Sequence, residues 1–242
     1  MLQHRKREIG LAICSSALAG YVDAIGFLSL GGFFVSFMSG NSTRLAVGIA
    51  GFSHDAIVAG QLIASFVLGA VVGALIGKFT GERRRQAVLS AVAASLAAAA
   101  GLANLGAPGI AMLFVALAMG AENATFERNG EVAIGLTYMT GTLVKLGQRI
   151  AAALTGGPKL AWAPYALLWI GLVAGAVAGA LIWPHAGLAG LWVASAGALL
   201  LAGAGWLVDR PQAEGASVVA HRCRRRRRRS STGCRPSCRR AG

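Results

Sequence analysis

The chain has 242 residues, of which 55% are hydrophobic and only 13% charged, and its mean hydropathy is +0.61. A soluble domain carries about 25% charged residues, and several apolar runs here approach the roughly 20 residues that cross a hydrocarbon core of about 30 Å. The composition therefore excludes a soluble globular domain and predicts an all-α integral membrane protein embedded in the lipid bilayer.

The basic charge is concentrated at the C-terminus. The formal net charge is +14, but residues 210–242 hold 11 of the 23 lysines and arginines and a single acid, Glu214. We interpret residues 209–242 as a disordered, Arg-rich cytoplasmic tail. Its unbroken arginine run, residues 224–229, is suited to contact with anionic lipid headgroups. Because the rest of the chain is nearly neutral, we expect no specific nucleic-acid partner.

Taken in chain order, the apolar runs predict six long helices after a basic cytoplasmic leader at residues 1–8. We expect these helices at residues 9–30, 56–77, 87–105, 110–126, 165–183 and 188–208. Residues 78–86 form a charged loop and residues 106–109 a tight turn. Two further segments, residues 33–51 and 133–154, mix apolar, hydroxyl and glycine residues and carry a shared motif.

This motif is part of an internal duplication. Residues 35–45 read VSFMSGNSTRL, and residues 136–146 read LTYMTGTLVKL. A pattern of Gly-x-x-Asp/Asn-Ala precedes each copy, and a triplet of glycines spaced by four follows it, always in the same order. The matched positions are Gly20, Asp23 and Ala24 with Gly120, Asn123 and Ala124, and Gly69, Gly73 and Gly77 with Gly171, Gly175 and Gly179. We infer two membrane repeats, residues 9–105 and 110–208.

The number of spans depends on whether each motif segment crosses the membrane. Eight spans would put Arg83, Arg84 and Arg85 outside, whereas six spans keep the basic segments and both termini cytoplasmic, as the positive-inside rule favours. We therefore expect about six transmembrane helices arranged as two inverted three-helix repeats, each with a broken or re-entrant glycine-containing segment. The glycine triplets are expected to pack the second long helix against the fifth.

These residues resemble a known family. Gly20-x-Val22-Asp23-Ala24, the segment FVSFMSGN at residues 34–41, and TYMTGT at residues 137–142 are similar to the YoaK family of bacterial inner-membrane proteins of unknown function. The resemblance covers about residues 10–208 and implies some six transmembrane helices in the bacterial inner membrane. It supplies no substrate and no catalytic residue.

Asp23 is the most informative single residue, because it is the only acid among the apolar residues of the first long helix. A carboxylate at membrane depth costs about 2.5–3.5 kcal/mol on the most lenient scale, so it normally faces a cavity or a partner. Asp23 is either a proton- or cation-coupling group or a brace for the motif backbone. Its repeat partner is Asn123. The neighbouring Glu122 points about 100° away along a helix, and we expect it to be an interfacial acid.

The two motifs are candidates for a binding site for a small polar or anionic solute. Each reads as a helix opening, with a hydroxyl residue to cap and a glycine for backbone freedom, and free N–H groups at such an opening suit an anion. Arg44 and Lys145 would add positive charge one turn further on. The alternative is close packing of two helices, with both basic side chains reaching the interface. The candidate binding residues are Asp23, Ser39, Gly40, Asn41, Asn123, Thr140, Gly141 and Thr142.

The function that we predict is a small-solute secondary transporter with a site near the membrane midplane between the two repeats. A non-transporting membrane scaffold or stress-related protein is the alternative. The membrane helices show neither a Ser/His pair nor paired carboxylates, and the four cysteines match no zinc-ligand spacing. We therefore expect no enzymatic activity, no cofactor and no metal.

Overall fold

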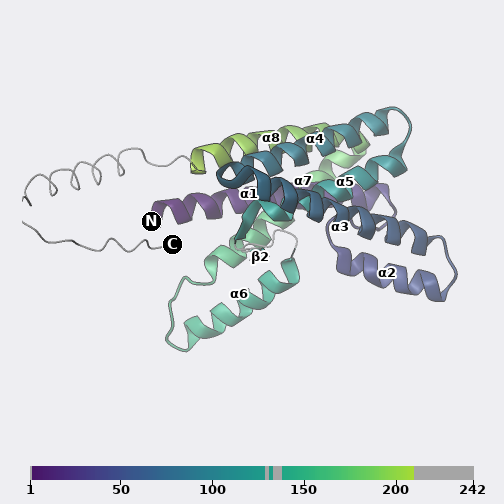
Figure 1. Ribbon diagram of the computed structural model, residues 1–242. Helices are drawn as coiled ribbons and strands as arrows, with labels where there is room; N and C mark the ends of the chain where they lie inside the picture. Colours follow the sequence, from purple (N-terminus) through teal and green to yellow (C-terminus); the bar gives the residue numbers. More distant parts are fainter. Residues whose placement is uncertain (1, 129–130, 133–137, 210–242) are drawn as a thin grey trace, which may run out of the picture. The chain divides into compact units, whose positions relative to one another are not determined.

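The computed structural model of the protein describes residues 2–128, 131–132 and 138–209 (Figure 1). The chain divides into two compact units after Asp209, and only the first contains described residues. The arginine-rich tail therefore lies outside them, as do the first two residues of the second motif, Leu136 and Thr137.

The described residues form an all-α membrane protein, as the composition predicts. The long helices are α1 (Leu2–Ser29), α3 (Asp55–Thr80), α4 (Arg84–Asn104), α5 (Pro108–Glu122), α7 (Ala163–Ala186) and α8 (Gly190–Asp209). Among them are five segments long and apolar enough to cross a membrane, and the last, Ala163–Trp206, contains α7 and most of α8. Short 3₁₀ turns join or extend these helices: η1 (Gly81–Arg83), η2 (Asn123–Phe126) and η3 (Gly187–Ala189). Strands β1 (Glu127–Arg128) and β2 (Glu131–Val132) pair in a small antiparallel hairpin.

Each motif segment forms a short helix. These are α2 (Met38–Ala50), with 13 residues, and α6 (Met139–Leu154), with 16. At a rise of 1.5 Å per residue they are about 20 and 24 Å long, which is less than the hydrocarbon core of about 30 Å. Neither is therefore long enough to cross the bilayer as a straight helix, unlike the long helices on either side.

Glycines set the closest approaches between the long helices. In α3, a Cβ atom on Gly69 or Gly73 would meet the backbone of Leu117 or Ala121 in α5. In α7, a Cβ atom on Gly175 would meet the backbone of Ala17 in α1. There is no space for any side chain at these contacts, so the helix backbones touch. We call the two units that result the α3–α5 pair and the α1–α7 pair.

The expectation that the two glycine triplets pack against each other is therefore wrong. Gly69 and Gly73 of α3 face α5, Gly77 meets the side chain of Arg84 in α4, and the triplet of α7 faces α1. Glycines leave the helix backbone open to close approach by another helix. The facing positions include Ala17 and Ala121 but also Leu117 and Tyr21, whose backbone atoms make the contact.

The same contacts give the direction of each helix. Residue numbers rise together along α3 and α5, and along α1 and α7, so each pair is parallel. The hydroxyl group of Ser195 in α8 donates a hydrogen bond of 2.8 Å to the carbonyl group of Ala93 in α4, and Gly205 approaches Arg85, so α4 and α8 are antiparallel. Gly197 and Gly205 in α8 likewise approach Leu18 and Leu11 in α1. The hydroxyl group of Ser95 in α4 donates a hydrogen bond of 2.8 Å to the carbonyl group of Phe114 in α5, across the turn that joins these helices, so α4 and α5 are also antiparallel. It follows that α1, α4 and α7 run in one direction and α3, α5 and α8 in the other (Figure 1).

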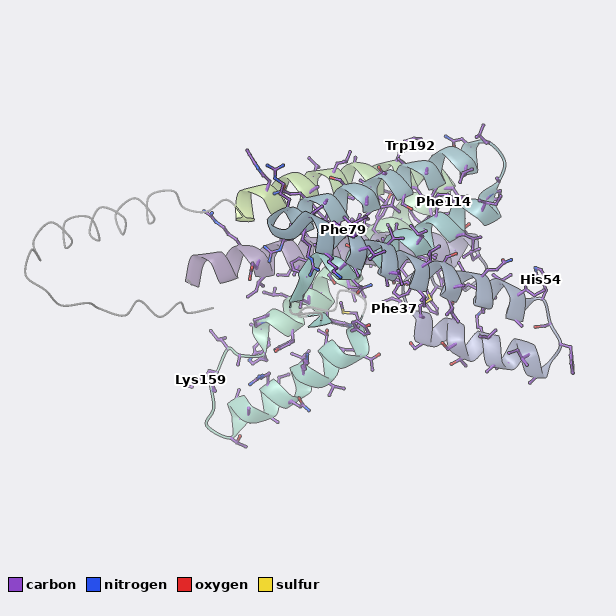
Figure 2. All side chains as sticks on the ribbon, viewed as in Figure 1. Phe37, His54, Phe79, Phe114, Lys159 and Trp192 are labelled. Carbon is purple, nitrogen blue, oxygen red and sulfur yellow. The ribbon has the colours of Figure 1, made fainter. Side chains whose placement is uncertain are left out.

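The outward faces of the long helices are apolar. Phe79 of α3 is 82% exposed and Leu200 of α8 is 76% exposed, and Phe79, Phe114 and Trp192 are among the side chains labelled in Figure 2. An exposed apolar surface of this extent is unfavourable in water and is expected against lipid tails. The surface of the helices thus agrees with a bilayer environment.

Candidate functional site

Asp23 holds the backbone that follows α1. Its side chain is only 4% exposed, and its Oδ1 atom accepts hydrogen bonds from the amides of Val35 and Ser36, at 3.0 and 2.8 Å. These residues lie between α1 and α2, where the chain is not helical and its amides need partners. Asp23 therefore braces the start of the first motif, which is one of the two roles predicted for it.

Asn41 braces the same connection from its other end. Its side chain is fully buried. Its Oδ1 atom accepts from the amide of Phe34 at 3.0 Å, and its Nδ2 atom donates to the carbonyl of Phe34 at 2.6 Å. The ring of Phe34 also packs edge-on against Phe37, with ring centroids 5.8 Å apart. The two polar side chains of α1 and α2 thus fix one conformation of residues 33–37.

The predicted charge-supporting residues differ in their surroundings. The guanidinium group of Arg44 lies 4.2 Å from the ring centroid of Phe33, in a cation–π contact with the connection that Asp23 braces. Lys145 lies on an exposed part of α6. The two basic groups are therefore not arranged alike, although the repeat aligns them.

The hydroxyl residues do not cap the two short helices, so that part of the prediction is wrong. The N-cap residues are Phe37 and Tyr138, and neither helix has a side-chain cap hydrogen bond. Ser39, Thr140 and Gly141 are exposed in the first turns, and Gly40 is half-buried. Thr142 is buried and donates its hydroxyl hydrogen to the carbonyl of Tyr138, at 3.2 Å. A hydroxyl group inside a helix commonly bonds to the carbonyl four residues earlier, and the hydroxyl of Ser42 does the same with Met38, at 2.8 Å.

The structure does not bring all the predicted binding residues together. α2 packs against α3, α6 packs against α7, and the described parts of α2 and α6 do not pack against each other. Asp23 lies toward the end of α1 that leads to α2, and Asn123 follows the end of α5. Because α1 and α5 are antiparallel and Phe126 packs against Leu11 and Ala12 of α1, Asn123 lies near the depth of Ser15, about 12 Å along the bundle from Asp23. Asn123 is buried, and its Nδ2 atom donates to the carbonyl of Met119 at 3.0 Å.

Glu122 is the candidate that the sequence did not reveal. It was expected to be an interfacial acid, because it points about 100° away from Asn123 along a helix. In the structure its side chain is 0% exposed, and neither carboxyl oxygen has a hydrogen-bond partner in the described part of the chain. The one sequence signal was its position, since the repeat aligns Glu122 with Val22, a core position of α1 that is also 0% exposed.

Comparison with known proteins places the chain among membrane proteins. The family described as "Protein of unknown function (DUF1275)" matches residues 11–204. A protein of Rhizobium meliloti (strain 1021) named as a UPF0700 transmembrane protein is 39% identical over 212 residues, covering 87% of this chain and 92% of that protein. No solved structure matches the chain.

Proposed function

The chain belongs to the family described as protein of unknown function DUF1275, and we propose that it is a small-solute secondary transporter of the bacterial inner membrane. The observation that carries this proposal is the direction of the helices. Helices that the repeat makes equivalent run in opposite directions: α1 against α5, α3 against α7, and α4 against α8. Inverted repeats of this kind recur in secondary transporters, where they frame a path that opens to either side. The narrower assignment to the YoaK family stays a prediction.

The tight glycine contacts suggest which parts would move. Helices α1 and α7 come from different repeats, as do α3 and α5, so the two repeats are not separate bodies. Because the backbones touch within each pair, we propose that the α1–α7 pair moves as one unit against the α3–α5 pair. The solute path would lie between the two pairs, with Asp23 and Asn123 at different depths along it. The exposed motif residues Ser39, Thr140 and Gly141 would meet the solute where it enters or leaves.

Topology gives the first test of this arrangement. With α1 entering from the cytoplasm, the turn that carries His54 faces outward and the loop that carries Lys159 faces the cytoplasm (Figure 2). In a variant with the native cysteines replaced by serine, we expect a membrane-impermeant maleimide to label His54→Cys in intact spheroplasts. Lys159→Cys should be labelled only after the membrane is permeabilised. Labelling of both sites from outside would contradict the six-span inverted arrangement and the cytoplasmic termini.

Transport itself is tested in proteoliposomes that contain a pH-sensitive dye. The probes are a set of amino acids, sugars, organic anions and inorganic phosphate, each added to one side in turn. We expect at least one of them to cause a change in internal pH with the native protein. Asp23→Asn should reduce that change at least tenfold while leaving the yield of folded protein unchanged, if Asp23 couples ion and solute. An equal loss of folded protein would assign Asp23 a bracing role alone.

One observation favours the alternative of a non-transporting membrane scaffold. Asp23 and Asn41, two buried polar residues of the first motif region, are both bonded to the backbone between α1 and α2. A folded, monodisperse protein that moves none of the solutes above would support this alternative against the transporter.

A further inference from the structure

Glu122 differs from Asp23, the other acid that is buried among the described residues. Asp23 has two amide donors on one oxygen, whereas both oxygens of Glu122 are buried without a donor in the described residues. An ionised carboxylate in such a place would carry a large desolvation cost without compensation. A carboxyl group that holds a proton is neutral, and this greatly reduces the cost.

The position of Glu122 can be derived from its neighbours. Phe126, one turn further along the chain, is buried in a cluster with Leu11 and Ala12 of α1 and Leu168 of α7. Because α5 and α1 are antiparallel, stepping back from Phe126 to Glu122 corresponds to stepping forward along α1 to about Ser15. Gly120 and Ala121 approach the backbone of α3, and the next residue of a helix is turned by about a further 100°. Glu122 therefore lies on the side of α5 that faces away from α3, toward the interior of the bundle.

Other polar groups without partners occur at the same depth. The hydroxyl oxygens of Ser15 and Thr125 are buried and have no hydrogen-bond partner among the described residues. The neighbouring Ser16, by contrast, donates to the carbonyl of Leu168 at 3.0 Å. Among the described residues, three unpartnered polar side chains therefore lie at about one depth of the bundle. Hydroxyl groups of this kind can relay a proton or hold a water molecule.

The charged and titratable groups on the helices packed around α5 lie next to groups other than Glu122 or are exposed. On α4, Arg85 pairs with Glu8 of α1 at 2.7 Å and lies 5.6 Å from the ring centroid of Phe126. Arg84 of α4 lies against Gly77 of α3, and Lys78 of α3 is exposed.

On α1, the hydroxyl group of Tyr21 donates to the carbonyl of Gly190 at 3.0 Å, and Asp23 accepts from the amides of Val35 and Ser36. None of these forms a hydrogen bond or ion pair with Glu122 in the described structure.

The fold itself does not require an acid at this position. Val22 occupies the equivalent position of the first repeat, where it is equally buried within the main hydrophobic core. An apolar side chain therefore satisfies the packing at one of the two equivalent sites. Retaining an unpartnered carboxyl group at the other costs stability, and polar groups that cost stability inside membranes commonly serve function.

We propose that Glu122 is the proton-binding site of the protein, facing the boundary between the α3–α5 and α1–α7 pairs. It holds a proton while the pairs are closed. When they part and water enters, the carboxyl O–H bond breaks, the proton passes to water, and the carboxylate that remains is solvated. This deepens the proposed transport function by naming the coupling ion as a proton. The protonated state of Glu122 does not itself depend on which solute is carried.

Infrared difference spectroscopy of the full-length protein in lipid tests the site directly. We expect the native protein at pH 7 to show the carbonyl stretching band of a protonated carboxyl group, shifted by exchange into D₂O. Glu122→Gln, which keeps the shape of the side chain, should lack this band, and Asp23→Asn should retain it. Glu122→Leu provides a second, apolar variant in case the amide disturbs folding.

Two results would overturn the proposal. One is the absence of the band in the native protein at pH 7, which would mean that Glu122 is ionised. The other is a band that persists in both Glu122 variants, which would assign the proton to another group. If the band behaves as expected but no solute changes the internal pH of proteoliposomes, the proton site stands and the transport function fails.

Discussion

Replacing Gly175 by alanine is expected to destabilise the folded protein strongly, although alanine is the better helix former. A Cβ atom at Gly175 would meet the backbone carbonyl of Ala17 in α1. A backbone cannot move aside as a flexible side chain can, so α1 and α7 would have to separate along their whole contact. Overpacking of this kind costs about 1–3 kcal/mol or more, which exceeds the gain of about 1 kcal/mol in helix propensity. Thermal unfolding in detergent, followed by size-exclusion chromatography, measures the change.

Gly203 of α8 provides the matched control. It is exposed, and a Cβ atom there would meet nothing within 4 Å. Gly203→Ala should therefore leave the melting temperature unchanged or raise it slightly through helix propensity alone. Gly69→Ala, which would meet the backbone of Leu117 in the α3–α5 pair, should behave like Gly175→Ala. Equal melting temperatures for all three variants would show that the backbones do not touch within the two pairs.

Replacing Asp23 by leucine is expected to have the second largest effect. Leucine has a similar size but cannot accept the hydrogen bonds that the amides of Val35 and Ser36 donate to Asp23. A buried donor left without a partner costs about 1–3 kcal/mol, so losing the acceptor for two of them should lower the melting temperature markedly. Asp23→Asn keeps an oxygen acceptor and should be nearly as stable as the native protein. The two variants therefore separate the bracing role from any coupling role.

Asp55 of α3 supplies the control for this comparison, because it is an exposed acid in the first turn of its helix. Asp55→Leu should change stability by no more than about 0.5 kcal/mol, as is usual for surface positions. If Asp23→Leu were as mild as Asp55→Leu, the connection between α1 and α2 would not depend on the carboxyl group of Asp23.

For much of the candidate site, the sequence predicts which residues matter but leaves more than one role open for each. Asp23 stood out in the sequence because an acid among apolar residues is costly wherever it points, and bracing was one of its two predicted roles. Which amides it binds depends on the path of residues 33–37, and only the folded chain defines that path. Ser39 and Thr140 were wrongly expected to cap because helix ends are placed to within one or two residues at best. Each helix begins at the methionine just before the hydroxyl residue.

The sequence by itself determined the class of protein and its helical segments, since the thickness of the hydrocarbon core sets helix length and apolar content locally along the chain. It also predicts the duplication. Only the tertiary structure decided which helices touch, because the glycine triplets of α3 and α7 offer equivalent surfaces and each selects its partner from elsewhere in the chain. For the same reason it alone decided the burial of Glu122. An acid beside polar residues looks interfacial in the sequence, and the packing of other helices around α5 removes it from water.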